Sequence, residues 1–149
     1  MALHDIISEE VIRAPLVSAT KTDVIKELIH ALQDVHKISD FDTVYDAVSA
    51  REDLGPTGLE YGIAVPHAKT PAVQNLTAAI GISPNGVDFF AIDGKPSHLI
   101  FLILAPPDQS GPYIELLAEI ARMTRSNTFR EMLISATSPQ QILNIFREE

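Results

Sequence analysis

A continuous run of apolar residues, Leu99 to Ala105, constrains the fold more than any other part of this sequence. The run does not alternate between apolar and polar residues, and Pro106 and Pro107 follow it directly. A strand with one face in water alternates, whereas a strand that is covered on both faces does not. We therefore expect Leu99 to Ala105 to be a central strand, buried on both faces and ended by the two prolines.

Shorter apolar runs predict the strands that accompany it. Ile63–Val65 and Leu76–Ile82 have the length and composition of strands, and Val87–Ala91 has those of an edge strand. Asp93-Gly94, which lies between the edge strand and the central strand, predicts a tight turn. Before all of these, residues 6–17 are expected to be extended.

Helical patterns lie on both sides of this group of strands in the chain. Thr20 and Asp40 are suitable N-caps for two helices that precede the strands. Apolar stripes around residues 114–121 and 129–133 predict two helices after them, and Ser138-Pro139 is a typical start for a last one. Helices, then strands, then helices predict an α/β or α+β domain with a mixed sheet.

Composition narrows the functions that remain open. A chain of 149 residues without an internal repeat or linker is expected to form one domain over residues 1–149. The absence of cysteine excludes disulfides, thiolate nucleophiles and zinc sites built on sulfur. The net charge of −9 argues against nucleic acid or anionic lipid as a partner. No signal peptide and no apolar run of ~18 residues is present, so we expect a cytoplasmic domain that does not insert into a membrane.

The segment from Arg51 to His67 has the residue types of a phosphoryl-binding site. A neutral imidazole has one lone pair that can attack phosphorus, and the pKa of histidine lies near working pH. A bound phosphoryl group carries about two negative charges, which the planar guanidinium of Arg51 can partly neutralise. The Thr57 hydroxyl and the N–H groups around Gly58, in a turn of the sequence Gly55-Pro-Thr-Gly, can supply further donors. Such chemistry requires no metal and no cofactor.

Each of these residues also has an ordinary structural interpretation. A histidine after a strand is commonly a satisfied structural residue. An arginine near the end of a helix commonly interacts with the helix dipole, and glycines commonly serve turns. The residues alone therefore leave both interpretations open.

The sequence resembles the enzyme IIA domain of the mannitol/fructose class (type 2) of the bacterial phosphoenolpyruvate-dependent sugar phosphotransferase system. The specific part of the match runs from Arg51-Glu52 through Leu54-Gly55 and Thr57-Gly58 to Gly62-Ile-Ala-Val-Pro-His67-Ala-Lys69. Supporting matches are Phe90-Ala-Ile-Asp-Gly-Lys-Pro96, Leu99 to Pro106, and Leu116 to Arg122. Nearly the whole chain is covered.

The resemblance implies a mixed sheet of about five strands with helices packed on both faces. It implies that His67 is phosphorylated on Nε2 and that Arg51 is the phosphate-site arginine. The implied donor is the small phosphocarrier HPr or a relative of it. The implied acceptor is a IIB domain, or there is no acceptor if phosphorylation serves only as a signal.

The chain departs from the family pattern at a second histidine, which family members commonly carry at the start of the helix after Ala-Pro. Tyr113 stands at that position, and a tyrosine can donate a hydrogen bond to a phosphoryl oxygen but cannot carry charge as an imidazolium does. Its alternative role is to cover the edge of the core. Pro56, Glu60 and Tyr61 also replace small or polar residues, and Glu60 must point to solvent if it is not to oppose a phosphate.

Three hypotheses follow. The chain is a phosphotransferase that accepts phosphate from HPr on His67 and passes it to a IIB domain for uptake of fructose- or mannitol-type sugars. Alternatively, it is a regulatory IIA of the nitrogen-related type, whose phosphorylation switches its binding to a target protein. In a third hypothesis it is a degenerate binding module that is not phosphorylated. A weak homodimer is compatible with each of them.

Overall fold

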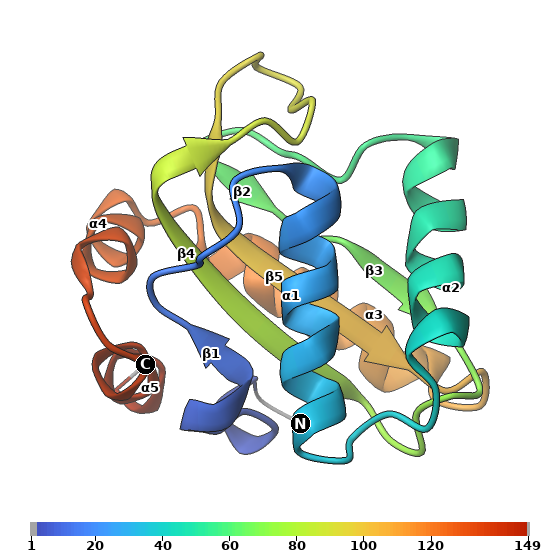
Figure 1. The fold of residues 1–149 in the computed structure, drawn as a ribbon. Coiled ribbons are helices and arrows are strands. Elements are labelled where there is room, and N and C mark those ends of the chain that lie inside the picture. Colours follow the sequence, from blue (N-terminus) through green and yellow to red (C-terminus); the bar gives the residue numbers. More distant parts are fainter. Residues whose placement is uncertain (1–2, 149) are drawn as a thin grey trace.

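A mixed sheet forms the middle layer of the computed structural model of this chain, which describes residues 3–148 (Figure 1). The strand order is β1-β4-β5-β2, and β3 pairs with the same edge of β5 as β2. β4 and β5 are antiparallel, and all other pairs are parallel. The five strands are β1 (Ile12–Arg13), β2 (Ile63–Ala64), β3 (His67–Lys69), β4 (Thr77–Val87) and β5 (Ser97–Ala105). The predicted mixed sheet of five strands is confirmed.

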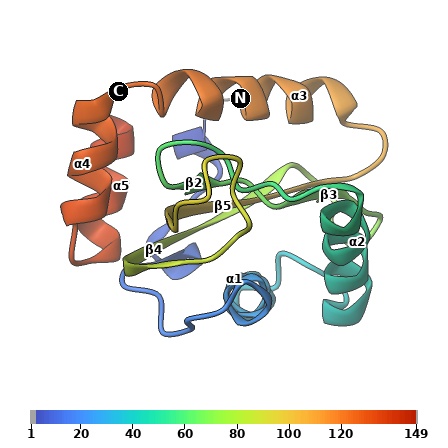
Figure 2. The same cartoon turned by 90° about the horizontal axis from the view of Figure 1, so that it is seen from above.

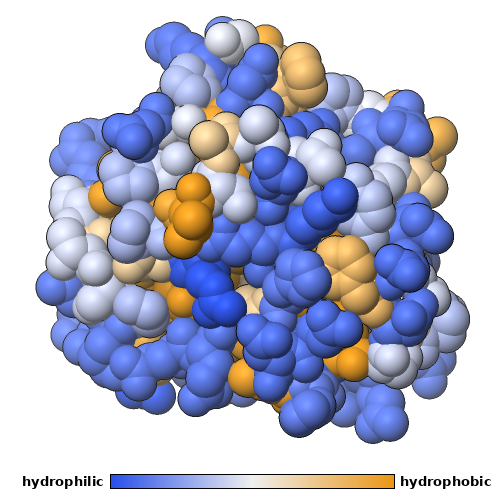
Figure 3. Space-filling view, viewed as in Figure 1, coloured by the Kyte–Doolittle hydropathy of each residue, from blue (hydrophilic) through white to orange (hydrophobic). Residues whose placement is uncertain are grey.

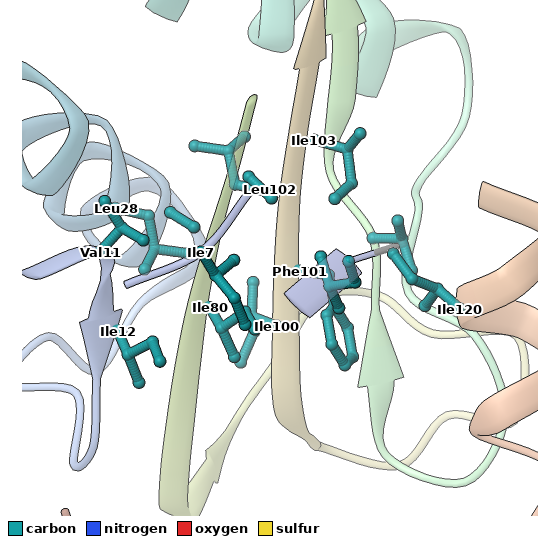
Figure 4. Close-up of a cluster of buried hydrophobic side chains, with 14 of the residues drawn as sticks. Ile7, Val11, Ile12, Leu28, Ile80, Ile100, Phe101, Leu102, Ile103 and Ile120 are labelled. Atoms are coloured by element: carbon teal, nitrogen blue, oxygen red, sulfur yellow. The ribbon is translucent and has the colours of Figure 1, made fainter. Parts of the chain in front are cut away.

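The predicted central strand is β5, which pairs on both of its edges. Every residue from Leu99 to Ala105 is buried. Figure 4 shows the β5 side chains Ile100 to Ile103 between Leu28 of α1 and Ile120 of α3. Burial of each large apolar side chain contributes about 1.5–3 kcal/mol to folding, so this strand is the energetic centre of the domain.

Helices cover both faces of the sheet (Figure 2). One face is covered by α1 (Lys21–Asp34) and α2 (Phe41–Leu54). The other is covered by α3 (Ser110–Met123), with α4 (Asn127–Ser135) and α5 (Pro139–Arg147) beside it. Two short 3-10 helices, Leu3–Asp5 and Glu9–Val11, precede β1. None of the helices in the described part of the chain has the length and apolarity to cross a bilayer.

The predicted helix starts are confirmed by their side-chain caps. Thr20, Asp40 and Ser138 each accept a hydrogen bond from a backbone N–H in the first turn of α1, α2 and α5, respectively. A cap of this kind contributes about 1 kcal/mol. These three residues set where α1, α2 and α5 begin.

The prediction of an edge strand over Val87–Ala91 is wrong. β4 ends at Val87, and residues 88–91 leave the sheet. The N–H of Phe90 donates to the Asp88 carboxylate at 2.8 Å, and Phe90 has a φ of 54°, in the left-handed region. An aspartate that accepts from the backbone two residues on makes a turn in place of a strand.

The predicted extended start is only partly correct, because residues 6–17 contain the helix Glu9–Val11; the segment pairs with β4 at Ile12–Arg13, and the N–H of Leu16 donates to the carbonyl of Ile82. The predicted turn at Asp93-Gly94 is confirmed. Gly94 has a φ of 72°, and its N–H donates to the Ala91 carbonyl at 3.0 Å. This turn leads the chain back into β5.

The face that carries α1 and α2 is mostly hydrophilic, with apolar side chains in small separate groups (Figure 3). Scattered apolar groups of this size are ordinary on a protein surface.

Candidate functional site

A pocket of about 190 Å³ lies beside His67. Three parts of the chain form it: the last turn of α2 with the following turn, the segment that leads into β3, and the second half of α3 with its C-cap. It is lined by Arg51, Pro56, Thr57, Leu59, Val65, His67, Leu117, Ile120, Ala121 and Thr124. The structure thus brings Arg51, Thr57 and His67 to one small cavity, as the sequence predicts.

His67 is the first residue of β3 and is half-buried. Its Nδ1 lies 2.6 Å from the carbonyl oxygen of Val65. A carbonyl oxygen only accepts hydrogen bonds, so Nδ1 must carry the ring proton. The lone pair of the neutral ring is therefore on Nε2, which is the nitrogen able to attack phosphorus.

Burial lowers the pKa of the His67 imidazole below its ordinary value, and the positive charge of Arg51 acts in the same direction. The hydrogen bond to the Val65 carbonyl and the negative charge of Glu52 act in the opposite direction and only partly offset the lowering. The ring is consequently neutral at pH 7, which is the form that can act as a nucleophile.

The lowered pKa makes a prediction for the pH dependence of phosphorylation. The ring gains its proton only at a lower pH than an ordinary histidine, whose pKa is about 6.5. We therefore expect the rate of phosphoryl uptake from a prephosphorylated donor to stay constant as the pH is lowered through about 6.5. The rate is expected to fall only below the lowered pKa of His67. An NMR titration of His67, compared with a peptide of residues 63–71, tests this. A higher pKa in the folded chain than in the peptide would contradict it.

Arg51 lies in the last turn of α2, as predicted, and is half-buried. Its Nη1 donates to the Gly55 carbonyl at 2.9 Å, and it forms no ion pair with a carboxylate in the described part of the chain. A guanidinium has five N–H donors, so most of them are available. The cation is held at the pocket wall with its charge uncompensated by a direct partner.

Thr57 and Gly58 lie beside the pocket, but their polar groups are arranged differently from the prediction. The hydroxyl and the N–H of Thr57 both donate to the buried carboxylate of Glu52. Gly58 is not one of the residues lining the pocket; an added Cβ there would lie 2.9 Å from the Phe89 carbonyl oxygen. Direct donation from Thr57 or Gly58 to a phosphoryl group stays a prediction, and donation by the Thr57 hydroxyl would require exchange of its bond to Glu52.

Tyr113 lies next to His67, with 5.8 Å between the ring centroids. It is buried, and burial raises the pKa of its hydroxyl to about 12, although the charge of Arg51 opposes this. The hydroxyl is therefore protonated at every physiological pH and can donate a hydrogen bond. The two interpretations of Tyr113 are compatible, because it covers the core edge and also lies beside the nucleophile.

The other departures from the family pattern do not enter the pocket, apart from Pro56. Glu60 is exposed, as its charge requires, and Tyr61 is exposed with a φ of 64°. Both line a neighbouring groove, and Arg130 lies over the Tyr61 ring at 4.4 Å. A carboxylate in water opposes an anion in the pocket only weakly.

Two residues at the site were missed by the sequence analysis. Glu52 is buried beside Thr57, and Lys21 forms an ion pair with it at 2.6 Å. The start of α3 lies beside His67, as the assignment of Tyr113 predicts, and Gln109 at its cap makes no side-chain hydrogen bond to the helix. The positive end of a helix dipole favours an anion. Nothing in the spacing of Lys21 and Glu52 signals their contact.

Residues 3–148 contain no group of three or more histidine, aspartate or glutamate side chains arranged to hold a metal ion. A neutral imidazole and a guanidinium line the pocket, and a protonated phenol lies beside the imidazole. Together they can hold a small tetrahedral anion against a nitrogen nucleophile, which is the arrangement that phosphoryl transfer by positioning and electrostatics requires.

Comparison with known proteins points to one family. Residues 5–149 match the family model described as "Phosphoenolpyruvate-dependent sugar phosphotransferase system, EIIA 2". The fructose-specific EIIA component of Haloferax volcanii is 36% identical over 130 residues, which are 87% of this chain and 84% of that protein. The fructose-specific EIIABC component of Bacillus subtilis is 32% identical over 99% of this chain, but the chain spans only 23% of that protein.

Solved structures have the same fold. The nitrogen regulatory protein IIA-Ntr of Neisseria meningitidis has a TM-score of 0.88 at 29% identity, over 97% of this chain and 98% of that one. The mannitol IIA enzyme of Escherichia coli, solved as a complex with its phosphorylated IIB enzyme, has a TM-score of 0.81 at 22% identity, over 96% and 98% of the two chains. At that identity, the second likeness establishes the fold alone.

Proposed function

The chain belongs to the EIIA 2 family of the phosphoenolpyruvate-dependent sugar phosphotransferase system, and we propose that it carries the phosphoryl group on Nε2 of His67. The observation that carries this assignment is the 2.6 Å hydrogen bond from Nδ1 of His67 to the Val65 carbonyl. That bond leaves the Nε2 lone pair free in a ring that faces the same pocket as Arg51.

The transfer of the phosphoryl group needs no general base, because the attacking nitrogen carries no proton. The Nε2 lone pair attacks the phosphorus of a phosphohistidine on the donor, the Nε2–P bond forms, and the N–P bond of the donor breaks. The donor ring leaves with the electron pair of that bond. His67 keeps its proton on Nδ1, where the Val65 carbonyl stabilises the positive charge that the ring acquires. Arg51 stabilises the phosphoryl oxygens.

We assign the donor to an HPr-like phosphocarrier protein and the acceptor to a IIB domain. The family assignment supports both, and the mannitol IIA enzyme of Escherichia coli forms such a complex with its IIB enzyme. Exposed apolar side chains border the site, namely Leu59 at its rim and Ile114 beside Tyr113. They give a partner protein apolar surface to cover while the phosphoryl group is transferred.

A regulatory role is the second candidate, favoured by the likeness to IIA-Ntr of Neisseria meningitidis. In this role the charge on His67 changes the affinity for a target protein. The two roles differ in the fate of the phosphoryl group. A carrier loses it to an added IIB domain, whereas a regulatory protein keeps it until hydrolysis. In either role we propose that residues 1–149 act as one domain in the cytoplasm, which the absence of cysteine supports.

Incubation with phosphoenolpyruvate, enzyme I and HPr tests the proposal. We expect the intact mass to increase by one phosphoryl group and the modification to be lost in acid, because a phosphoramidate is labile. An unmodified chain, in a reaction where HPr itself is shown to be phosphorylated, would support the degenerate binding module instead.

Tyr113 is expected to contribute less than His67 or Arg51 to the rate of phosphoryl uptake. Loss of one neutral hydrogen bond costs about 1 kcal/mol, so we expect Tyr113→Phe to slow phosphoryl uptake about 5-fold and to leave the fold intact. Tyr45→Phe on α2, which removes the same hydroxyl away from the pocket, is the matched control. Equal rates for the two variants would show that Tyr113 only covers the core edge.

A further inference from the structure

We propose that Lys21 and Glu52 are positioning residues, which act on His67 through a series of hydrogen bonds that runs from α1 to β3 and is joined by the backbones of Thr57 and Val65. The inference rests on the proposed function, because it concerns how the same imidazole is held. Neither residue lines the pocket. Apart from the charge of Glu52, which acts on the ring directly, their effect passes through the residues that lie between them and the ring.

The first half of the series is centred on the Glu52 carboxylate. Lys21 Nζ lies 2.6 Å from Glu52 Oε2. The N–H of Thr57 donates to the same oxygen at 3.2 Å, and the Thr57 hydroxyl donates to Oε1. Both carboxylate oxygens are thus occupied, and the carboxylate fixes both donors of the residue that forms one wall of the pocket.

The second half leads from that wall to the nucleophile. The Thr57 carbonyl accepts from the N–H of Val65 at 3.1 Å. The Val65 carbonyl accepts from His67 Nδ1 at 2.6 Å. The N–H and the carbonyl of Thr57 belong to different peptide groups, as do those of Val65, so the series acts by fixing the positions of these two residues. The last bond is the one that determines the tautomer of His67 and the direction of its ring.

The ion pair between Lys21 and Glu52 is largely buried, so the loss of either partner is expected to disturb the site. The side chains of Lys21 and Glu52 are only 17% and 6% exposed. A carboxylate in such a place needs a partner, because an unpaired buried charge is strongly unfavourable. With Lys21 in place the pair is neutral as a whole, so the charge of Arg51 is left to act on the phosphoryl group.

Lys21 lies over two aromatic rings, those of Phe89 and Phe90, but it is placed against the helix dipole. It is the first residue of α1, where a cation is unfavourable to the helix dipole. Figure 1 shows the start of α1 and the end of α2 at the same end of these two helices. The helices therefore bring Lys21 and Glu52 together just behind the turn at Thr57.

The test is Lys21→Met, with Lys26→Met as the matched control. Lys26 lies on the same helix and contacts the Tyr45 ring instead of Glu52, so the two variants share the change in net charge. We expect Lys21→Met to slow phosphoryl uptake about 10-fold or more and to raise the pKa of His67, since the charge of Glu52 is no longer neutralised. Lys21→Arg is expected to restore both quantities.

Glu52→Gln gives a second test that does not depend on the stability of Lys21→Met. The amide keeps an acceptor for Thr57 but loses the negative charge, so we expect the NMR titration of His67 to shift to lower pH. A role confined to stability would change the thermal transition without moving this titration. The inference is overturned if Glu52→Gln leaves the titration of His67 unchanged, or if Lys21→Met matches Lys26→Met in rate and titration.

The two proposals fail in different ways. The NMR titration of His67 is measured on the unphosphorylated chain, so the positioning series can be tested even if the chain accepts no phosphoryl group. A wild-type chain that is not phosphorylated contradicts the proposed function. A chain that is phosphorylated at the same rate with and without the Lys21–Glu52 pair contradicts the positioning series alone.

Discussion

The His67→Gln variant is expected to take up no phosphoryl group from HPr. Glutamine keeps a polar side chain of similar reach, but an amide nitrogen has no lone pair available to attack phosphorus. His67 is half-buried, and the hydrogen bond that its ring makes within the described residues goes to a neighbouring carbonyl, so the substitution is expected to leave the fold intact. The intact mass after incubation with phosphoenolpyruvate, enzyme I and HPr measures the effect, and the thermal transition checks the fold.

His98→Gln is the matched control for this variant. His98 is also half-buried, and its Nδ1 also lies close to a backbone carbonyl, that of Ser83 at 2.8 Å. It is outside the pocket, so we expect the control to be phosphorylated at the wild-type rate. Retention of a labile phosphoryl group by His67→Gln would show that another residue carries it.

The second large effect is expected from Arg51→Ala. Removing one preorganised donor from a site of developing negative charge typically costs about 100- to 1000-fold in rate. The fold should survive, because the guanidinium donates only to the Gly55 carbonyl and pairs with no described carboxylate. The charge of Arg51 lowers the pKa of His67, so the same variant is expected to shift the NMR titration of His67 to higher pH.

Arg122→Ala is the control for the loss of an arginine. Arg122 lies in the last turn of α3 as Arg51 does in the last turn of α2, but it is exposed and does not line the pocket. We expect it to leave the rate of phosphoryl uptake unchanged. If Arg51→Ala loses its cooperative thermal transition, the role of Arg51 is structural and its assignment to the phosphate site fails.

The sequence predicts those parts of this fold in which local chemistry and tertiary packing agree. The non-alternating run from Leu99 to Ala105 predicts the central strand, because no polar residue interrupts it. Thr20, Asp40 and Ser138 predict helix starts, because a cap is a contact between neighbours in the chain. The edge strand over Val87–Ala91 is mispredicted, because an aspartate at residue 88 makes a turn within a segment whose composition favours a strand.

The site likewise has some residues that the sequence predicts and others that only tertiary packing brings together. A short stretch of sequence contains Arg51, Thr57 and His67, and its composition points to phosphoryl chemistry. The pairing of Lys21 with Glu52 joins helices that are separate in the sequence, and the burial of the carboxylate depends on that packing. The closeness of Tyr113 to His67 likewise depends on how α3 lies against the sheet. Such contacts leave no periodicity or spacing in the sequence.

The most direct test of the central claim is the NMR spectrum of the phosphorylated chain with nitrogen-15 in its histidines. We expect the phosphorus to be bonded to Nε2 of His67, with the proton retained on Nδ1 and hydrogen-bonded to the Val65 carbonyl. A phosphoryl group on Nδ1 of His67, or on any other residue, would contradict the account.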